Sequence, residues 1–429
     1  MPRIQDVDAI TPLLLDKIPI SRAGGSTPIC ATIEGIINVD PRTNRLSLHN
    51  VQSVTGPIAV TTFSAFYHVF SIVHKNTGVV YAISTAVTGQ TTQSIYKSLD
   101  GGVNWTSMGN ITVDIAGGDR LSKIYVEPRG ETIVILKSKN TSPATYEVNT
   151  YNSTLSLLGS LDIGKATWHS AMHNVDATVL DGTYDNVIMF AEYVNTSAGA
   201  VATVRVWKTV DRGINWTVAF EQTADNGTTG SGEVRHFHTL QVDPFTNDWW
   251  LSSGDSNAQC KIWRSQNDGI DWTLLYSGSQ EERTLSFVFE LNHVYYGMDS
   301  PDSGIDTNIY KITRATMDKE VVAVAWNNLA VYSLTKTFYP DGFLVWLVYE
   351  SASSAPTDVV KIQFFDYKTN KLINAGEILK TITFTGFLEA SRYQSLQDGG
   401  IFVTPMDLGI IYGGNTSTRS AFLKAKLTV

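Results

Sequence analysis

The stretch Ser-Leu-Asp-Gly-Gly-Val-Asn-Trp, residues 98–105, recurs twice along the chain without a gap. The later copies read Thr-Val-Asp-Arg-Gly-Ile-Asn-Trp at 209–216 and Ser-Gln-Asn-Asp-Gly-Ile-Asp-Trp at 265–272. Threonine follows each tryptophan, and an aromatic residue with a basic neighbour precedes each copy. The shared pattern is Ser/Thr-x-Asp/Asn-x-Gly-x-x-Trp-Thr. Repetition of this kind indicates one supersecondary unit that the chain uses several times.

The pattern predicts a tight turn between two β-strands. Its Asp or Asn side chain would accept N–H bonds from the turn, and its glycine would provide a positive φ angle. The tryptophan would then pack beneath the turn. We therefore interpret these residues as structural and assign them no catalytic role: Asp100, Trp105, Asp211, Trp216, Asn267 and Trp272.

The repeat resembles the Asp-box, or BNR, repeat of sialidase-like β-propellers. This resemblance implies a ring of four-stranded antiparallel sheets, called blades. In that family the boxed turn joins the third and fourth strands of a blade, on the face away from the ligand site. Short runs rich in Val, Ile, Thr, Tyr and Phe throughout the chain also predict an all-β fold.

The spacing of the copies predicts a seven-bladed β-propeller, with six or eight blades as alternatives. The first interval is about twice the second, so a degenerate copy is expected at 146–158. The last blade lacks a fourth strand, and we expect residues 33–49 to supply it and close the ring by pairing the two chain ends. Residues 1–30 are interpreted as an extension that docks to other subunits, and 31–429 as one propeller. The expected blades lie near 58–110, 111–162, 166–222, 232–280, 282–327, 328–380 and 383–429.

Composition narrows the classes of function. Hydrophobic residues make up 43% of the chain and charged residues 17%, which rules out a disordered protein. The net charge of −9 and the lack of a basic run argue against a nucleic-acid partner. No apolar run is long enough to span a membrane as a helix. Cys30 and Cys260 are the only cysteines, so at most one disulfide is possible within the chain.

Asn-X-Ser/Thr sequons favour an exterior location, although the N-terminus shows no secretory signal. A virus or phage particle surface, reached by assembly, would reconcile the two observations. A cytoplasmic location is the alternative. The candidate glycosylation sites outside the boxes are Asn110, Asn140, Asn152, Asn195, Asn226 and Asn415.

Candidate site residues follow from the propeller geometry. The face opposite the boxes is lined by connections from fourth to first and from second to third strands. In the fourth predicted blade, His236 and His238 are two residues apart on a strand and should point to the same side. The candidates for this face are Glu233, Arg235, His236, His238, Asp255, Trp168, His169, Arg283, Arg392 and Tyr393. Six histidines near first or second strands could line an axial channel: His68, His169, His173, His236, His238 and His293.

These residue types suit carboxylate or sulfate binding, proton transfer and contact with sugar faces, or simply hydrogen bonding between blades. A metal on His236 and His238 would need ligands from other blades, which the sequence does not place, so no metal or cofactor is expected. The catalytic set of sialidases is not recognisable, because Arg3-Ile4 is followed by Gln5 instead of the family's proline.

The leading hypothesis is a non-enzymatic module that recognises glycans or a host receptor at a surface. One alternative is a glycan-active enzyme, either a sialidase-like glycosidase or a polysaccharide lyase, with an axial active site. A second is an intracellular assembly factor.

Overall fold

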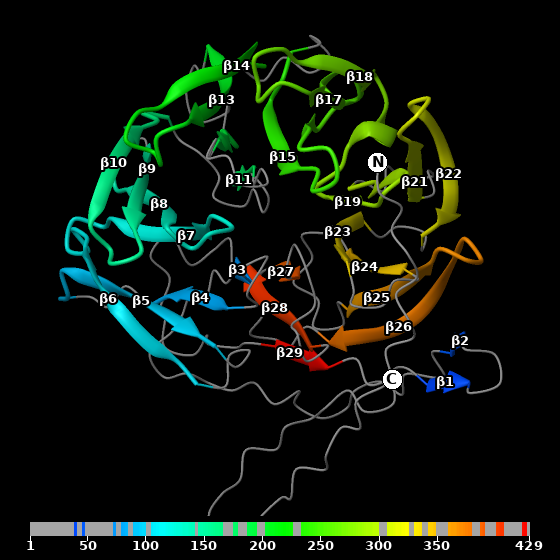
Figure 1. Ribbon diagram of the computed structural model, residues 1–429, viewed down its shortest axis with the longest axis horizontal. Helices are drawn as coiled ribbons and strands as arrows, with labels where there is room; N and C mark the ends of the chain where they lie inside the picture. The colour runs from blue at the N-terminus through cyan, green and yellow to red at the C-terminus, as the bar shows by residue number, and fades with distance from the viewer. Residues whose placement is uncertain are drawn as a thin grey trace, which may run out of the picture.

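The computed structural model describes 18 segments of the chain: residues 38–40, 45–47, 72–73, 79–84, 89–99, 104–141, 145–165, 175–178, 187–194, 202–225, 233–299, 307–325, 330–336, 342–348, 359–379, 387–390, 400–406 and 423–426. The described strands form six four-stranded sheets and one three-stranded sheet around a central axis, with a two-stranded hairpin outside the ring (Figure 1). Within each four-stranded sheet the strands pair antiparallel in chain order, from the innermost to the outermost. The expected all-β propeller with four-stranded antiparallel blades is therefore confirmed. The number of blades stays a prediction, because much of the last sheet's range lies outside the described residues.

The strand bounds follow the expected blade ranges closely. The first two sheets contain β3 (Ile72–Val73), β4 (Val80–Ile83), β5 (Thr92–Ser98), β6 (Thr106–Thr112), β7 (Arg120–Val126), β8 (Thr132–Lys139), β9 (Thr145–Asn152) and β10 (Leu157–Asp162). The next two contain β11 (Val175–Ala177), β12 (Ile188–Ala191), β13 (Thr203–Thr209), β14 (Thr217–Thr223), β15 (His236–Val242), β16 (Trp249–Gly254), β17 (Lys261–Ser265) and β18 (Thr273–Ser277). The last three contain β19 (Phe287–Phe289), β20 (His293–Gly297), β21 (Asn308–Thr313), β22 (Asp318–Val324), β23 (Ala330–Lys336), β24 (Gly342–Val348), β25 (Val359–Asp366), β26 (Lys371–Leu379), β27 (Phe387–Ala390), β28 (Gly400–Met406) and β29 (Leu423–Lys426). Two 3-10 turns, η2 (Asn257–Gln259) and η3 (Gln280–Glu282), flank β17 and β18.

Among the described strands, the N-terminal ones do not join the last sheet, contrary to the expected pairing of the chain ends. Strand β1 (Asn38–Asp40) pairs with β2 (Arg45–Ser47), and among the described strands the last sheet holds β27, β28 and β29 alone. Figure 1 shows this three-stranded sheet between the sixth and first sheets, with the β1–β2 hairpin at the periphery. Joining two neighbouring segments closes a much shorter loop than joining the chain ends, so the local hairpin costs less entropy. The expected docking extension, residues 1–30, lies outside the described residues.

The hydrophobic core lies between neighbouring sheets. One cluster joins Met189 and Val206 of the third sheet to Phe237, Leu251 and other residues of the fourth. Corresponding clusters join the first and second, second and third, fourth and fifth, and fifth and sixth sheets. The first six sheets therefore bury apolar side chains against their neighbours, which makes this part of the ring a rigid support for its loops.

The boxed turn between β13 and β14 has the predicted hydrogen bonds. Oδ1 of Asp211 accepts bonds from the Asn215 N–H, at 2.9 Å, and from Oγ1 of Thr209, at 2.8 Å. Arg212 and Gly213 adopt φ angles of 63° and 81° in the turn.

The turn of the third copy repeats the arrangement, with the Asp271 N–H donating to Oδ1 of Asn267 at 2.9 Å. Trp216 and Trp272 are half-buried and pack against inter-blade clusters. Asp100 lies outside the described residues, and Trp105 is half-buried. In the two copies described throughout, the box therefore forms the predicted hydrogen-bonded turn, and the structural role of its residues stays a prediction.

Each of these two turns also contacts the preceding blade. Oγ1 of Thr150 on β9 donates to the carbonyl oxygen of Gly213 at 2.9 Å. A Cβ atom at Gly213 would lie 2.2 Å from Cγ2 of Thr150, and one at Gly269 would lie 2.6 Å from Cε of Met189 on β12. Glycine is needed at Gly213 and Gly269 for this close approach as well as for the positive φ angle.

We expect Gly213→Ala to lower the free energy of unfolding by about 2–4 kcal/mol, because it adds a steric clash to an unfavourable backbone conformation. Gly164 is a matched control, because its φ is +63° and a Cβ atom there would have no neighbour within 4 Å. Gly164→Ala should lower the free energy by only about 1 kcal/mol. Urea-induced unfolding of both variants measures the difference, and equal losses would contradict the inter-blade contact.

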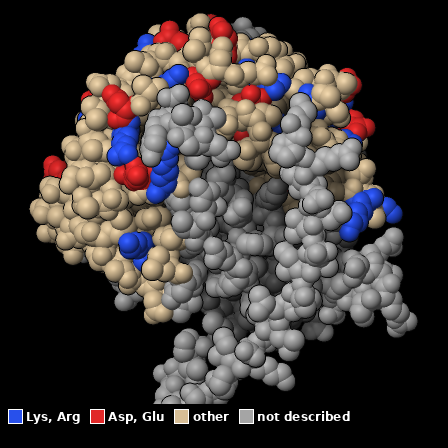
Figure 2. Space-filling view, viewed as in Figure 1, with Lys and Arg blue, Asp and Glu red and all other residues tan. Residues whose placement is uncertain are grey.

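The surface carries charges of both signs. In the described part of the face shown in Figure 2, basic and acidic side chains alternate instead of gathering by sign. Among the described residues, none of the helices has the length and apolar character needed to cross a membrane.

Candidate functional site

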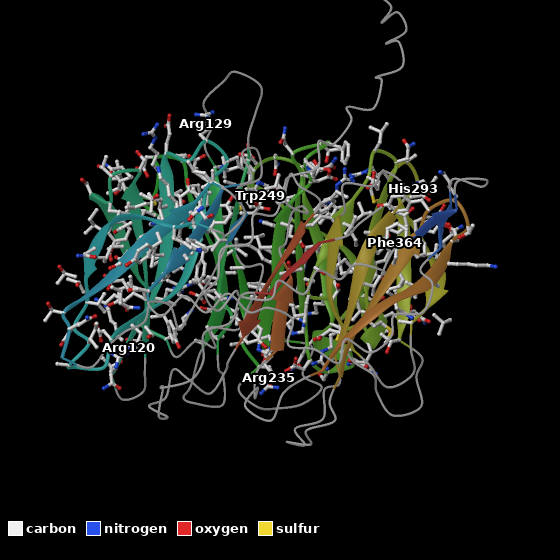
Figure 3. All side chains as sticks on the ribbon, turned by 90° about the horizontal axis from the view of Figure 1, so that it is seen from below. Arg120, Arg129, Arg235, Trp249, His293 and Phe364 are labelled. Atoms are coloured by element: carbon white, nitrogen blue, oxygen red, sulfur yellow. The ribbon has the colours of Figure 1, made fainter. Side chains whose placement is uncertain are left out.

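The candidate residues of the fourth blade lie at one end of the ring. Figure 3 shows Arg120 and Arg235 at one end of the blades, and Arg129 and His293 toward the other. Arg235 directly precedes β15, so it lies on the face formed by connections from fourth to first strands, as expected. His293 begins β20 after the turn from β19, on the opposite face. The expectation that His293 shares an axial channel with the other histidines is therefore wrong, because β20 runs in the opposite direction to β15.

His236 and His238 point to the same side of β15, as predicted. The pairing of β15 with β16 contains a β-bulge between Phe237 and Thr239, which includes His238. Bulges redirect side chains and are common beside functional sites. The two imidazole rings stack with centroids 5.0 Å apart, and their Nε2 atoms are separated by 3.1 Å.

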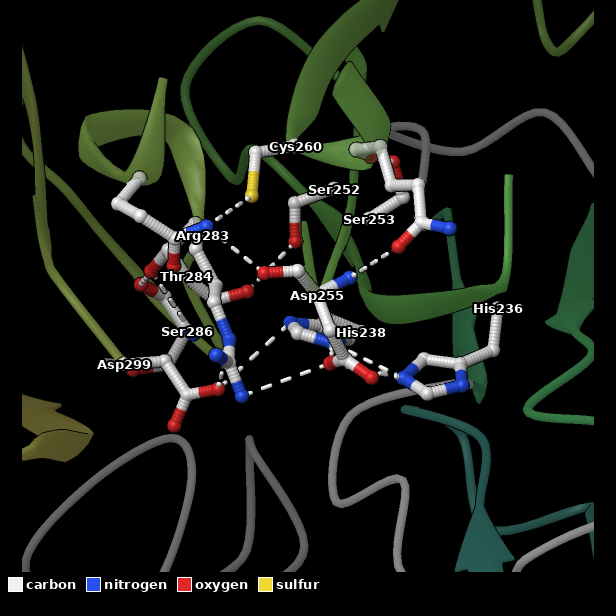
Figure 4. Close-up of polar contacts among 12 residues, drawn as sticks. His236, His238, Ser252, Ser253, Asp255, Cys260, Arg283, Thr284, Ser286 and Asp299 are labelled. Atoms are coloured by element: carbon white, nitrogen blue, oxygen red, sulfur yellow. Dashed lines mark hydrogen bonds and ion pairs between the residues drawn. The ribbon is translucent and has the colours of Figure 1, made fainter. Parts of the chain in front are cut away.

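Asp255 completes this pair from the connection that follows β16. Its Oδ1 atom lies 3.3 Å from Nε2 of His238 and 3.4 Å from Nε2 of His236, and the side chains converge in Figure 4. Its Oδ2 atom accepts a hydrogen bond from Nη1 of Arg235 at 2.6 Å. The preceding residue, Gly254, permits the approach, because a Cβ there would lie 2.5 Å from Cε1 of His238. The three donor atoms form a set that could hold a metal ion.

The connection bearing Asp255 is held by hydrogen bonds. Oε1 of Gln259 accepts the N–H groups of Asp255 and Ser256, at 3.1 and 2.9 Å. Nε2 of Gln280 donates to the carbonyl oxygen of Asp255 at 2.7 Å. Oγ of Ser253 donates to the carbonyl oxygen of Gln259 at 2.6 Å. These bonds fix the Asp255 backbone, so the carboxylate is preorganised towards the histidines.

The fifth blade adds an arginine and a second aspartate. Arg283 follows η3, and its Nε donates to Oδ2 of Asp299 at 3.1 Å, while its Nη2 lies 3.4 Å from Oδ1 of Asp255. Oδ2 of Asp299 is 3.8 Å from Nδ1 of His238. Figure 4 shows Arg283 between the two carboxylates. Sequence reasoning missed Asp299, although it follows the second strand of its blade as Asp255 does.

The third blade contributes an aromatic ring. Tyr193 follows β12 and is half-buried. Its ring stacks on His236, with centroids 3.9 Å apart and planes inclined by 20°. Tyr193 was not among the residues predicted from the sequence, and its place after a second strand is again the signal that would have identified it.

Burial and pairing determine the charge states in this cluster. Burial lowers the pKa of His238 to about 4, so the imidazole is neutral at neutral pH. Burial alone would raise the pKa of Asp255, but hydrogen bonds from His236 and His238 outweigh it and hold the pKa well below its ordinary value. The nearby Cys260 is buried and free, and burial raises the pKa of its thiol to about 12.

The structure brings half of the candidate residues into one cluster: Arg235, His236, His238, Asp255 and Arg283. Glu233 is half-buried, and its charge opposes the lowering of the Lys261 pKa that burial causes. The remaining candidates lie outside the described residues: Trp168, His169, Arg392 and Tyr393.

The candidate glycosylation sites differ in exposure. Asn110 and Asn140 are exposed, and Asn152 is half-buried. The other three sites lie outside the described residues: Asn195, Asn226 and Asn415.

Comparison with known proteins finds no matching family model and no matching curated protein. Among solved structures, a chain of the mitotic checkpoint complex has a TM-score of 0.51 and 10% identity, over 89% of this chain and 98% of that chain. A prolyl endopeptidase has a TM-score of 0.47 and 9% identity, over 80% of this chain and 51% of that one. Sqt1 of Saccharomyces cerevisiae has a TM-score of 0.47 and 10% identity, over 79% of this chain and 80% of its own. At these identities the likeness concerns the fold.

Proposed function

We propose that this protein is a non-catalytic recognition propeller that binds an acidic glycan, carrying carboxylate or sulfate groups, on a cell or receptor surface. The observation that carries the proposal is the position of Arg235. Its side chain is 39% exposed at the axial face, and its guanidinium is bound to the carboxylate of Asp255. An exposed arginine held by a fixed partner is suited to capture an anion.

The chemistry of the surrounding groups supports an acidic sugar as the ligand. A guanidinium presents several N–H donors in one plane, which match the oxygens of a carboxylate or sulfate. Asp255 occupies one edge of the Arg235 guanidinium and restricts its orientation. The half-buried ring of Tyr193 lies on the same face, stacked on His236, and aromatic rings of this kind combine an apolar body with a polar edge.

The pairing of the carboxylates supports binding without hydrolysis. Glycosidases generally use two carboxyl groups with separate tasks, one of which donates a proton. In this cluster Asp255 is paired with Arg235, and Asp299 is paired with Arg283. Each carboxylate thus positions an arginine, which is the arrangement of a binding site.

We also propose an extracellular or particle-surface location, which the exposed sequons at Asn110 and Asn140 support. In the assembly-factor alternative, the propeller also acts in recognition, but its partner is another protein. One solved chain of similar fold belongs to the mitotic checkpoint complex, so a propeller of this shape can serve in a multi-protein assembly.

Binding to immobilised acidic and neutral glycans tests the proposal. Arg235→Ala should weaken binding of acidic glycans by about 10–100-fold, because it removes a charge-assisted hydrogen bond. Arg205 on β13 is a matched control, since it is also paired with a carboxylate, that of Glu221, and its side chain is 33% exposed. Arg205→Ala should leave the affinity unchanged.

Two results would contradict the proposal. If the folded protein bound no acidic glycan and instead bound a protein partner, the assembly role would replace glycan recognition. Release of new reducing ends or unsaturated sugars from a bound glycan would show that the site is catalytic.

A further inference from the structure

Three donor atoms of the site cluster form a nearly equilateral triangle. Nε2 of His236, Nε2 of His238 and Oδ1 of Asp255 are separated by 3.1, 3.3 and 3.4 Å. Zinc bonds to nitrogen and carboxylate oxygen of roughly 2.0–2.1 Å imply a distance of about 3.3 Å between two ligands of a tetrahedral site. The observed triangle therefore has the dimensions of one face of a zinc coordination tetrahedron.

Hydrogen bonds alone do not satisfy all three contacts. A neutral imidazole carries one proton, on either Nδ1 or Nε2. If both Nε2 atoms carry protons, two N–H groups face each other across 3.1 Å. If only one does, the bare nitrogen faces a lone pair of Asp255. Wherever the protons of two neutral imidazoles are placed, at least one edge of the triangle therefore joins two N–H groups or two lone pairs. A cation above the triangle would instead attract all three atoms.

We propose that His236, His238 and Asp255 bind one zinc ion through these atoms. Two imidazoles and one carboxylate are a common ligand set for zinc, and three protein ligands leave a fourth position for water or an anionic oxygen. The third ligand comes from the same blade as the two histidines, contrary to the expectation that any further ligands would come from other blades. The β-bulge in β15 and the absence of a side chain at Gly254 create this local set.

The surrounding groups suit a partly shielded site. Oδ2 of Asp299 lies 3.8 Å from Nδ1 of His238, the ring nitrogen that does not belong to the triangle. Metal-bound histidines commonly have a carboxylate partner at this second nitrogen. Arg235 binds Oδ2 of Asp255 and leaves Oδ1 directed at the histidines. Arg283 lies 3.4 Å from Oδ1, so its positive charge opposes that of the ion. The predicted site is therefore specific in geometry and moderate in affinity.

The test is titration of chelator-treated full-length protein with zinc chloride in a calorimeter. We expect one zinc ion to bind per chain, with moderate affinity. His236→Gln and Asp255→Asn should each weaken zinc binding by at least about 100-fold. Removing a group that only hydrogen-bonds to a metal ligand typically lowers metal affinity by roughly 10–100-fold, and removing a ligand should lower it further. His293→Gln is the matched control, because His293 lies on the opposite face, and it should bind zinc as the wild type does.

Cobalt binding provides a spectroscopic test that needs only the wild-type protein. Co²⁺ bound to the wild-type protein should give the intense visible absorption of tetrahedral cobalt, which zinc then displaces. Absence of a one-to-one zinc site in the wild type, a weak octahedral cobalt spectrum, or equally tight binding by a folded His236→Gln protein would each overturn the proposal. Circular dichroism before titration establishes that each variant is folded.

The zinc site shares Asp255 with the proposed glycan site, but the two proposals can fail independently. Zinc binding with no affinity for acidic glycans would support the metal site and contradict the recognition role. Glycan binding that is unaffected by zinc, with no metal bound, would do the reverse. Hydrolysis of an acidic glycan by the zinc-loaded protein would overturn only the non-catalytic part of the proposed function.

Discussion

Glu192→Ala is expected to lower the free energy of unfolding by about 3–5 kcal/mol, the loss typical of removing one partner from a buried ion pair. Glu192 follows β12 and is fully buried. Its Oε2 atom accepts bonds from Nζ of Lys165, at 2.7 Å, and from the N–H of Arg205, at 3.0 Å. Its Oε1 atom accepts a bond from Nε1 of Trp207 at 2.8 Å. Alanine would leave all three donors without this acceptor.

Urea-induced unfolding measures the loss, with Glu221→Ala as the control. The Glu221 side chain is 42% exposed and paired with Arg205, so its removal should change the free energy by about 1 kcal/mol or less. If the two alanine variants were equally stable, the buried acceptor would not support the third blade.

Glu192→Gln separates the charge of this residue from its hydrogen bonds. Burial raises the pKa of Glu192 more than Lys165 lowers it, so the folded protein holds this proton to a higher pH than the unfolded chain. The stability that follows from the shift is present below the unfolded pKa and is lost as the pH rises through the folded one. The wild type should therefore lose stability relative to Glu192→Gln as the pH rises from the acid range. A constant difference between the two would contradict the raised pKa.

Trp216→Ala should lower the free energy of unfolding by about 3–5 kcal/mol, as loss of a large aromatic side chain from a core does. Trp216 is half-buried and packs against the cluster between the second and third sheets, which contains Phe190 and Tyr146. Its Nε1 atom has no hydrogen-bond partner among the described residues, so packing accounts for the expected loss. Trp216→Phe should for this reason retain more of the stability than Trp216→Ala.

Ile214 provides the control for the tryptophan, because it lies in the same turn and is 53% exposed. Ile214→Ala should change stability by about 0.5 kcal/mol or less. Glycan and zinc affinities of the folded Trp216→Ala protein should remain unchanged, since the boxed turn is on the other face. If Trp216→Ala lost ligand binding without losing stability, the face that carries the boxed turns would be the ligand-binding face.

The fold was predictable because its signal is local and repeated. The boxed turn needs particular residues at particular positions: an acceptor such as Asp211, a glycine such as Gly213 and a packing residue such as Trp216. Each requirement appears in the sequence at the same spacing, so the copies mark the boundary between the third and fourth strands. The positions of His236 and His238 followed from the alternation of side chains along a strand.

The details of the site depend on contacts that no local pattern encodes. Tyr193, Asp255 and Asp299 come from three different blades, and their meeting depends on how neighbouring sheets are packed. All three follow a second strand, so aligning the blades with one another would have identified the position but not the partner. The β-bulge that redirects His238 leaves no clear mark in the sequence. The predicted pairing of the chain ends was wrong because the pattern showed a missing strand without showing that Asn38–Asp40 pairs with Arg45–Ser47.

The contact of the two fully described boxed turns with the blade before them bears on how the chain folds during synthesis. The turn at Gly213 contacts β9, and the turn at Gly269 contacts β12, so in both cases the contacted strand comes earlier in the chain. A newly translated blade would therefore emerge from the ribosome to find its neighbour already in place. If the blades fold in order from the N-terminus, the apolar face of each blade is exposed only until the next blade has been synthesised. This short exposure limits aggregation.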